Sequence, residues 1–237
     1  MSARYVIGAI GAAILVACAK TAESAPASAK SASAAITAAP VATYGPDAVP
    51  VVMDTALLRK ADAGRIDGDP NARLIVLEVS DFQCPYCKTF HDQTYPALRT
   101  TYIASGKTRI AYVNLPLRSH QNAWPAAEAA MCASAQGKFW VMHDSLFNSQ
   151  ERWAGLAKAD TMFIRFASTM QLDAAAYATC ISSHATRPLI ASDAERASSA
   201  GINGTPAFII GDSVLSGAYP FPDFKRVIDA NLASQRR

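Results

Sequence analysis

The stretch LIVLEVSDFQCPYC, residues 74–87, decides the fold of this chain. Within its apolar run, residues 74–77 have the continuous apolar character of a buried central strand. A segment with helical character follows over residues 85–104. Two cysteines three positions apart at a helix start place one sulfur at the exposed first turn and the other one turn further in, close enough to bond. The stretch therefore predicts a redox site in which Cys84 attacks and Cys87 resolves.

The helix start also sets the chemistry of the two sulfurs. Unpaired backbone N–H groups and the helix dipole stabilise an anion there, so we expect the pKa of the Cys84 thiol to fall below the free value of about 8.5. Pro85 suits the first helical position because no N–H is needed there and its φ is already helical. Cys87 lies further inside, and we expect a higher pKa for its thiol. The sulfur with the lower pKa is also the better leaving group.

The overall composition allows a substantial core and argues against one class of partner. Apolar residue types make up 51% of the 237 residues, although alanine raises that share. The formal net charge is +3, and the sequence contains no block of Lys and Arg and no basic stripe interleaved with aromatic residues. We therefore assign the chain no nucleic-acid partner.

The first residues have the pattern of an export signal. Arg4 precedes an apolar run over residues 6–17 that is too short for a membrane-spanning helix. The tetrapeptide LVAC at 15–18 resembles the lipobox of bacterial lipoproteins, which predicts lipidation of Cys18 and a membrane anchor. The alternative is ordinary cleavage at the A-x-A pattern of residues 17–19, which would release a soluble protein and discard Cys18.

A flexible tether is expected after the signal. Residues 19–50 are rich in Ala, Ser, Thr and Pro, carry little charge and show neither a helical nor an alternating period. Such a segment cannot bury enough surface to offset the entropy of ordering. We predict that it lets a folded domain move in the space beside a membrane.

The five cysteines divide without remainder. With Cys18 assigned to lipid and Cys84 to Cys87, the remaining two are Cys132 and Cys180. Disulfides persist in exported proteins, so we predict a structural bond between them; the alternative is two buried free thiols. Closing that loop of about 48 residues would stabilise the fold by about 4 kcal/mol in the chain-entropy model.

The order of the expected elements favours an α/β fold. After a short helix at 55–63 and a turn-rich segment at 64–71, the first strand and a second strand at 108–115 flank the helix that starts at Pro85. This spacing predicts a right-handed crossover with parallel pairing. Residues 117–183 contain no convincing strand and predict a helical lobe. The expected helices of the lobe span residues 119–135, 138–147, 160–170 and 174–182. A returning helix is expected at 187–200, two closing strands at 207–210 and 213–215, and a last helix at 221–232.

Three motifs occur together: EVSDFQCPYC at 78–87, QGKFW at 136–140 followed by His143-Asp144, and GTPAF at 204–208. With them, the chain over about residues 66–235 resembles the DsbA-like branch of the thioredoxin superfamily. A lone C-x-x-C also occurs in zinc sites, but C-x-x-C after a buried strand with Thr-Pro about 120 residues later is specific. The resemblance implies a thioredoxin fold with an inserted all-helical subdomain: signal peptide and lipobox at 1–18, tether at 19–50, thioredoxin domain at 51–117 and 185–237, and insertion at 118–184.

The resemblance also implies a set of site residues. Glu78 corresponds to the buried acid of thioredoxin relatives, and we propose it as the proton acceptor for Cys87. The alternative is a strand-edge carboxylate facing solvent. Thr205-Pro206 matches the family's cis-proline loop, which faces the active-site disulfide and pairs with an extended substrate. Further substrate contacts are expected from Pro85 and from an apolar rim of Phe82, Tyr86 and Pro206.

The remaining histidines and tryptophans are interpreted as structural. His91 falls four residues after Cys87 on the same helix face, and we interpret it as a surface or second-shell histidine rather than one that acts on the thiol. The other histidines are expected to cap or pack, and the tryptophans to fill the core of the lobe: His120, His143 and His184, and Trp124, Trp140 and Trp153.

Together these features predict an enzyme rather than a binding module. The leading hypothesis is an extracytoplasmic, lipid-anchored thiol-disulfide oxidoreductase that needs no cofactor, acts on unfolded or reduced exported proteins and works as a dithiol oxidase. Tyr86 replaces the histidine of the strongly oxidising relatives, which favours a milder oxidant. By resemblance, the membrane redox partner would be DsbB-like for an oxidase or DsbD-like for an isomerase or reductase. A less favoured alternative is a lipoprotein that binds zinc or copper through Cys84, Cys87 and His91.

Overall fold

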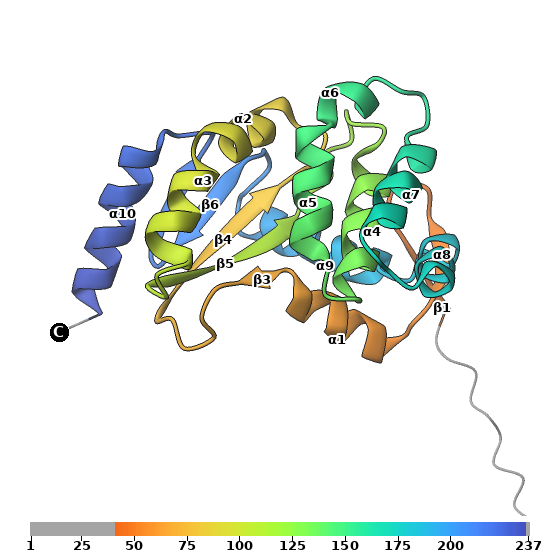
Figure 1. The fold of residues 1–237 in the computed structure, drawn as a ribbon, viewed down its shortest axis with the longest axis horizontal. Coiled ribbons are helices and arrows are strands. Elements are labelled where there is room, and N and C mark those ends of the chain that lie inside the picture. Colours follow the sequence, from red (N-terminus) through yellow and green to blue (C-terminus); the bar gives the residue numbers. More distant parts are fainter. Residues whose placement is uncertain (1–40, 236–237) are drawn as a thin grey trace, which may run out of the picture. The chain divides into compact units, whose positions relative to one another are not determined.

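The computed structural model describes residues 41–235, and its centre is a five-stranded mixed sheet with the strand order β3-β5-β4-β6-β7 (Figure 1). Only β4 and β5 run parallel, as the predicted crossover requires. A separate antiparallel pair, β1-β2, lies outside this sheet. The strands are β1 (Val41–Tyr44), β2 (Val49–Val52), β3 (Ile66–Asp67), β4 (Leu74–Ser80), β5 (Thr108–Asn114), β6 (Ala207–Ile210) and β7 (Ser213–Ser216).

Helices surround the sheet and form the insertion. Three of them pack apolar side chains on one face of the sheet: α2, α3 and α10 contribute Phe90, Leu98 and Phe224 to a buried cluster with β4, β5 and β6. The opposite face is covered in part by α9. The helices are α1 (Thr55–Gly64), α2 (Pro85–Gln93), α3 (Tyr95–Leu98), the π-helical turn η1 (Arg99–Ile103), α4 (Ala123–Ser134), α5 (Phe139–Asn148), α6 (Gln150–Trp153), α7 (Asp160–Thr169), α8 (Ala174–Ser182), α9 (Arg187–Ser199) and α10 (Phe221–Ser234).

The structure confirms the two closing strands, which form a hairpin with a tight turn. Strands β6 and β7 pair antiparallel, with Ile210 opposite Ser213. The two-residue connection needs a left-handed backbone conformation, which Gly211 supplies with a φ of 58°. Strand β6 also pairs with β4, so this hairpin extends the sheet beside the strand that leads to Cys84.

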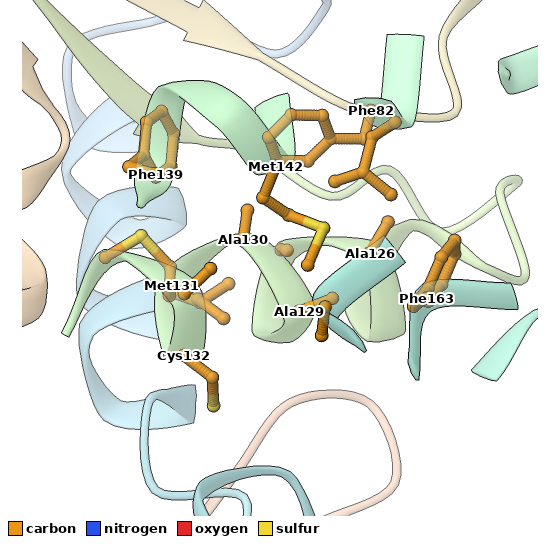
Figure 2. Packing of buried hydrophobic residues seen from close by; sticks show 14 of the residues in the cluster. Phe82, Ala126, Ala129, Ala130, Met131, Cys132, Phe139, Met142 and Phe163 are labelled. Atoms are coloured by element: carbon orange, nitrogen blue, oxygen red, sulfur yellow. The ribbon is translucent and has the colours of Figure 1, made fainter. Parts of the chain in front are cut away.

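The insertion and the sheet share one hydrophobic core. Helix α4 is rich in alanine, and its short side chains let α1, α5, α7 and α8 pack against it. Figure 2 shows this cluster, with Phe82 and Met142 above the alanine side chains of α4. The disulfide Cys132–Cys180 joins α4 to α8 and confirms the predicted pairing. The helical lobe is therefore continuous with the part of the fold that carries the cysteine motif.

The prediction of one helix over residues 85–104 is wrong in detail. Helix α2 ends at Gln93, and the chain bends at Thr94 before α3 and η1 continue. Pro96 explains the break, because proline has no N–H for a helical bond to Asp92 and its ring collides with that carbonyl group. The Thr94 hydroxyl donates instead to the Tyr219 carbonyl at 2.8 Å.

The prediction of a flexible tether up to residue 50 is also wrong at its C-terminal end. Residues 41–52 form the hairpin of β1 and β2, whose register pairs Tyr44 with Val49. The buried Arg187 of α9 holds this hairpin by donating to the Tyr44 carbonyl and to Asp47, while its Nε donates to Glu128 at 3.1 Å. Hydrogen bonds from a distant helix thus hold this hairpin in place, although the segment itself buries few apolar side chains. The signal, the lipobox cysteine and the rest of the tether lie outside the described residues.

Candidate functional site

Cys84, the cysteine predicted to attack, lies at the start of α2. Cys84 is the N-cap residue, Pro85 is the first helical residue, and Cys84 and Cys87 are both free thiols. The predicted exposure of Cys84 is wrong, since the residue is only 3% exposed. The loop at Thr205 covers it, and the Cys84 thiol donates to the Thr205 carbonyl at 3.4 Å. Cys84 is therefore a nearly buried residue that the Thr205 loop covers.

The surroundings of Cys84 favour its thiolate. A hydrogen bond from the Cys87 thiol is the largest effect and lowers the pKa of Cys84 to about 6, against the opposing effect of burial. The side chain of Thr205 and the backbone N–H groups of Tyr86 and Cys87 add to this stabilisation. Donation from helix-start amides is the arrangement that the sequence predicted, but it contributes less to the lowered pKa of Cys84 than the Cys87 thiol does.

Cys87 and Glu78 are buried near Cys84, and burial raises the pKa of both side chains. Burial, with the nearby Cys84 charge, raises the pKa of the fully buried Cys87 well above its ordinary value. Glu78 is 1% exposed on the central strand β4, and burial raises its pKa to about 7. The alternative of a strand-edge carboxylate facing solvent is therefore wrong. A carboxyl with this pKa can accept or return a proton near neutral pH.

The cis-proline loop closes the site from the other side. The peptide bond between Thr205 and Pro206 is cis, as predicted. Pro206 is buried next to strand β6, so its predicted place in an exposed apolar rim is wrong. Its carbonyl accepts a hydrogen bond from the Gly217 N–H. Tyr86 is 66% exposed, so the apolar surface beside the sulfur comes from Tyr86 and the exposed Pro85.

The prediction that Phe82 lines a substrate rim is wrong. Phe82 is 1% exposed and stacks on Tyr112 of β5, with ring centroids 4.7 Å apart. It also contacts Phe147 and His143 of α5. The residue points into the core shared with the insertion because α5 offers an aromatic surface there. Its role in the structure is to fix the loop before Cys84.

Polar side chains from the insertion also hold that loop, and sequence reasoning missed them. Gln150 of α6 is buried and donates to the carbonyls of Phe82 and Cys84, at 2.7 and 3.0 Å. Gln83 donates to the Ala154 carbonyl and accepts from the backbone N–H of Asn122. No local pattern in the sequence marks Gln150, because its partners lie more than 60 residues away along the chain.

Asp81 organises the turn before Cys84. Its carboxylate accepts hydrogen bonds from the backbone N–H groups of Gln83 and Leu117, and it pairs with Nδ1 of His120 at 2.7 Å. This hydrogen bond raises the pKa of His120, and the charge of Cys84 contributes in the same direction. His120 is thus a half-buried packing residue, as predicted, whose imidazole faces the turn before Cys84.

His91 is buried, which contradicts the surface position and leaves the other part of its interpretation, a histidine behind the site. Its Nδ1 pairs with Asp92 at 2.8 Å and its Nε2 lies 3.5 Å from Asp144. His143 is also buried and pairs with Asp144 at 2.8 Å. These carboxylates already satisfy the imidazoles as hydrogen-bonding groups, which supports a structural role.

The same three side chains bear on the metal-binding alternative. His91, His143 and Asp144 bring ligand atoms within 4.8 Å of one another and form the group among residues 41–235 that could hold a metal ion. Neither Cys84 nor Cys87 belongs to this group. The ligand set proposed from the sequence, two cysteines with His91, is therefore not assembled in the described part of the chain.

The other predicted packing residues lie in the lobe or beside it. Trp153 is fully buried, and its Nε1 donates to the Leu146 carbonyl. Trp140 is partly buried and stacks on Tyr95. The last two are Trp124, partly buried against the lobe core with the Arg187 guanidinium over its ring, and His184, which pairs with Glu128 at 2.8 Å.

The site can now be compared with known proteins. A thioredoxin family profile matches residues 60–230, which is well over half of the chain. The chain belongs to the thioredoxin family. Among solved structures, this thioredoxin-family protein is similar to alpha-DsbA1 of Wolbachia pipientis, with 26% identity, a TM-score of 0.64 and coverage of 72% of this chain and 91% of that one. Its fold is also similar to that of oxidised BdbD of Bacillus subtilis, with 21% identity and a TM-score of 0.66. The match covers 72% of this chain and 94% of BdbD.

Curated sequences give two kinds of relative. The thioredoxin-family chain is 31% identical over 186 residues to the Na(+)/H(+) antiporter NhaA 3 of Salinispora tropica, with 78% of this chain aligned. That alignment spans 27% of the antiporter, so the chain covers about a quarter of this relative's length. It is 24% identical over 171 residues to a probable disulfide bond formation protein D of Bacillus anthracis, covering 70% of this chain and 76% of the relative. Within residues 41–235, no helix is long and apolar enough to cross a membrane.

Proposed function

We propose that the protein is a thiol-disulfide oxidoreductase that exchanges disulfides with exported proteins through Cys84 and Cys87. The observation that carries this proposal is the contrast between two neighbouring thiols. The pKa of Cys84 is lowered to about 6, whereas the pKa of the buried Cys87 is raised. One sulfur is thus a nucleophile and leaving group at neutral pH, and the other is a protected resolving thiol. The similarity to alpha-DsbA1 and to a probable disulfide bond formation protein D supports the same reaction class.

In the oxidising direction the proposed reaction has two exchange steps. A substrate thiolate attacks Cys84 Sγ of the Cys84–Cys87 disulfide, and Cys87 leaves and takes a proton from Glu78. A second substrate thiolate then attacks the substrate sulfur of the mixed disulfide, and Cys84 leaves as a thiolate. Two electrons pass from the substrate dithiol to the cysteine pair, and the substrate gains a disulfide. The reverse sequence resolves or reduces substrate disulfides.

We propose that the protein works as a dithiol oxidase. Interactions that stabilise the Cys84 thiolate stabilise the reduced protein, and this makes its disulfide a stronger oxidant. Tyr86 is largely exposed and provides no imidazole, so the expected potential is that of a mild oxidant. The second candidate, an isomerase or reductase on the same site, is favoured if the measured potential is as low as that of thioredoxin, about −270 mV.

The exposed surface supports a preference for unfolded chains. Thr205 lies beside Cys84, and an extended substrate would pair with its backbone as an added strand. Tyr86 offers an apolar contact without a shaped pocket for one side chain. Recognition through backbone groups and one aromatic ring accepts many sequences.

The proposed location is extracytoplasmic, with a lipid anchor at Cys18. The buried disulfide between Cys132 and Cys180 supports an oxidising compartment, where such bonds persist. A membrane redox partner, DsbB-like for the oxidase or DsbD-like for the reductase, would restore the active form. Intact mass of the mature protein tests the anchor, because lipidation adds acyl chains to Cys18.

Alkylation and exchange assays test the proposed reaction. We expect iodoacetamide to modify Cys84 of the reduced protein with a half-maximal rate near pH 6, as the Cys84 pKa requires, while Cys87 stays protected. The protein should also reoxidise a reduced, unfolded disulfide protein, and Cys84→Ser should abolish this activity. Modification of Cys84 only at the pH of a free thiol, together with no exchange, would refute the proposal. A measured redox potential then separates oxidase from reductase.

A further inference from the structure

Three buried polar side chains behind Cys87 lack direct hydrogen bonds. Both carboxylate oxygens of Glu78, the hydroxyl of Ser80 and the hydroxyl of Tyr112 make none with any described protein group. All three residues are at most 1% exposed. A polar group that is buried without a partner destabilises the fold, and native structures contain few of them. Three in one place beside a reactive thiol therefore need a functional explanation.

The sheet register places these groups together. Glu78 and Ser80 are two residues apart on β4 and so project to the same face. Tyr112 is the register partner of Glu78 on the parallel strand β5, and it therefore projects to that face as well. Cys87 lies in the same cluster of buried residues as Tyr112. Backbone geometry alone thus directs three oxygen-bearing side chains toward the region of the resolving sulfur.

Ser80 is the member that affects the pKa of all the others. Its hydroxyl lies close enough to lower the pKa of Glu78, of Cys87 and of Tyr112. Burial nevertheless keeps the pKa of Tyr112 well above its ordinary value. The phenol is therefore neutral at physiological pH and can donate a hydrogen bond. A neighbouring phenol donor leaves the Ser80 hydroxyl free to give its own proton to a carboxylate.

We propose that the Ser80 hydroxyl, oriented by the Tyr112 hydroxyl, carries the proton between the Cys87 thiol and the Glu78 carboxylate. This inference rests on the proposed exchange reaction at Cys84 and Cys87. When Cys87 resolves a mixed disulfide, its S–H proton passes to Ser80 Oγ while the Ser80 proton passes to Glu78. The Cys87 sulfur then bonds to Cys84 Sγ, and the substrate sulfur leaves as a thiolate. Ser80 is a catalytic residue in this step, and Tyr112 is a positioning residue.

Other charged and titratable groups act on this route without lying in it. Across the elements packed on Glu78 and Cys87, they are Asp81 and Cys84 of the turn before α2, His91 of α2 and Tyr95 of α3, with His143 and Asp144 of α5 in contact with His91. None of them lowers the pKa of Glu78, Cys87 and Tyr112 together. Removing the Ser80 hydroxyl should therefore raise the pKa of Cys87 and move the pH profile of resolution to higher pH, a change that loss of packing alone does not produce.

The test separates formation of the mixed disulfide from its resolution. The reduced full-length protein is mixed with oxidised glutathione, and the reaction is quenched with acid at successive times over a range of pH. Cys84 first forms a glutathione mixed disulfide, and Cys87 then releases glutathione from it. With Ser80→Ala we expect the mixed disulfide to accumulate, with resolution slowed about tenfold or more near neutral pH and restored at alkaline pH. Tyr112→Phe should give a smaller change of the same kind, and Ser80→Thr should restore the rate.

Matched controls remove other buried hydroxyls that lack partners. Thr108→Val acts on the same sheet, six residues along β5 from Asn114, which pairs with Ser80. Tyr177→Phe removes a buried phenol of α8. Both controls should keep the resolution rate and its pH profile. The relay is overturned if Ser80→Ala resolves at the wild-type rate with an unchanged pH profile. Failure of the wild-type protein to form any mixed disulfide would instead refute the proposed function.

Discussion

At the scale of single residues, the surroundings of Cys84 and Glu78 bring two very different acids close to neutrality. Hydrogen bonds, chiefly from Cys87, lower the pKa of Cys84 to about 6, and burial raises the pKa of Glu78 to about 7. The two shifts have different physical origins. One acts by stabilising an anion with donors, and the other by withholding water from an anion. An exchange reaction near neutral pH needs both.

The Glu78 shift has a measurable effect on stability. Its folded-state pKa of about 7 lies above the ordinary value of 4.5, so protonation of Glu78 stabilises the folded state fully below the lower value. That stabilisation is lost as pH rises through the folded-state pKa. We expect Glu78→Gln to avoid this loss, so that the variant gains about 3 kcal/mol of unfolding free energy relative to its parent between about pH 5 and about pH 9.

Urea unfolding at the two pH values measures this change. A Cys84→Ala background serves for both proteins, because the Cys84 thiol would otherwise titrate in the same range. An identical pH dependence in parent and variant would show that Glu78 is not a buried acid with a raised pKa.

Sequence reasoning identified the reacting residues more securely than their neighbours. Cys84 and Cys87 follow from a motif whose spacing is set by one helix turn, and Glu78 follows from the resemblance to thioredoxin relatives. Phe82 was misplaced because a loop residue has no periodicity that shows which side it faces. Its position depends on the aromatic surface of α5, which comes from residues about 60 positions later in the chain. The surface alternative for His91 was wrong for the same reason, since His143 and Phe147 of α5 pack against its ring.

At the scale of elements, the close approach of α1 to α4 depends on a glycine. The Ser134 hydroxyl of α4 donates to the Ala61 carbonyl at 2.6 Å. A Cβ atom at Gly64 would lie 2.5 Å from the Ser134 carbonyl oxygen. The last turn of α1 therefore has no room for a side chain.

We expect Gly64→Ala to force α1 away from α4 and to lower the unfolding free energy by about 1–3 kcal/mol. Thermal unfolding of the oxidised protein measures this loss as a lower midpoint temperature. Gly155→Ala is the matched control, because a Cβ atom there would meet nothing within 4 Å. Equal midpoints for the two variants would contradict the predicted contact.

The elements that sequence reasoning found are those with strong local signals. The central strands, the lobe helices and the closing hairpin have clear periodicity or turn residues. The break at Thr94 was missed although Pro96, which removes a helical hydrogen bond, lies inside the predicted helix. The short strand β3 and the hairpin of β1 and β2 were missed because their pairing partners and anchors are distant in sequence.

At the scale of the whole molecule, one covalent bond links the start and the end of the insertion. The bond between Cys132 and Cys180 closes a loop with a sequence separation of 48. Replacing both residues by alanine removes that constraint on the unfolded chain. We expect the unfolding free energy to fall by about 4 kcal/mol, measured by urea unfolding without reductant. A loss below about 1 kcal/mol would contradict a stabilising role for this bond.

The whole-molecule prediction from sequence was right in topology and incomplete in its view of domains. The motif order predicted a thioredoxin fold with an inserted helical lobe, and the described residues have that arrangement. The boundaries at residues 118 and 184 describe connectivity rather than packing, because one hydrophobic cluster contains residues from both sides of them. Hydrophobic pattern along a chain shows which residues are buried and leaves open which other residues they contact.

The stacking of Phe82 on Tyr112 and against α5 limits how this scaffold can be engineered. A lobe transplanted from a relative would need aromatic side chains that pack against Phe82. Without them, the loop before Cys84 would lose the contacts that hold it in place. Chimeras that exchange the lobe alone should therefore express poorly, whereas chimeras that move Phe82 together with α5 keep the interlocking surfaces matched. The segment to exchange between relatives is therefore larger than the insertion, because it must include the residues outside the insertion that the lobe contacts.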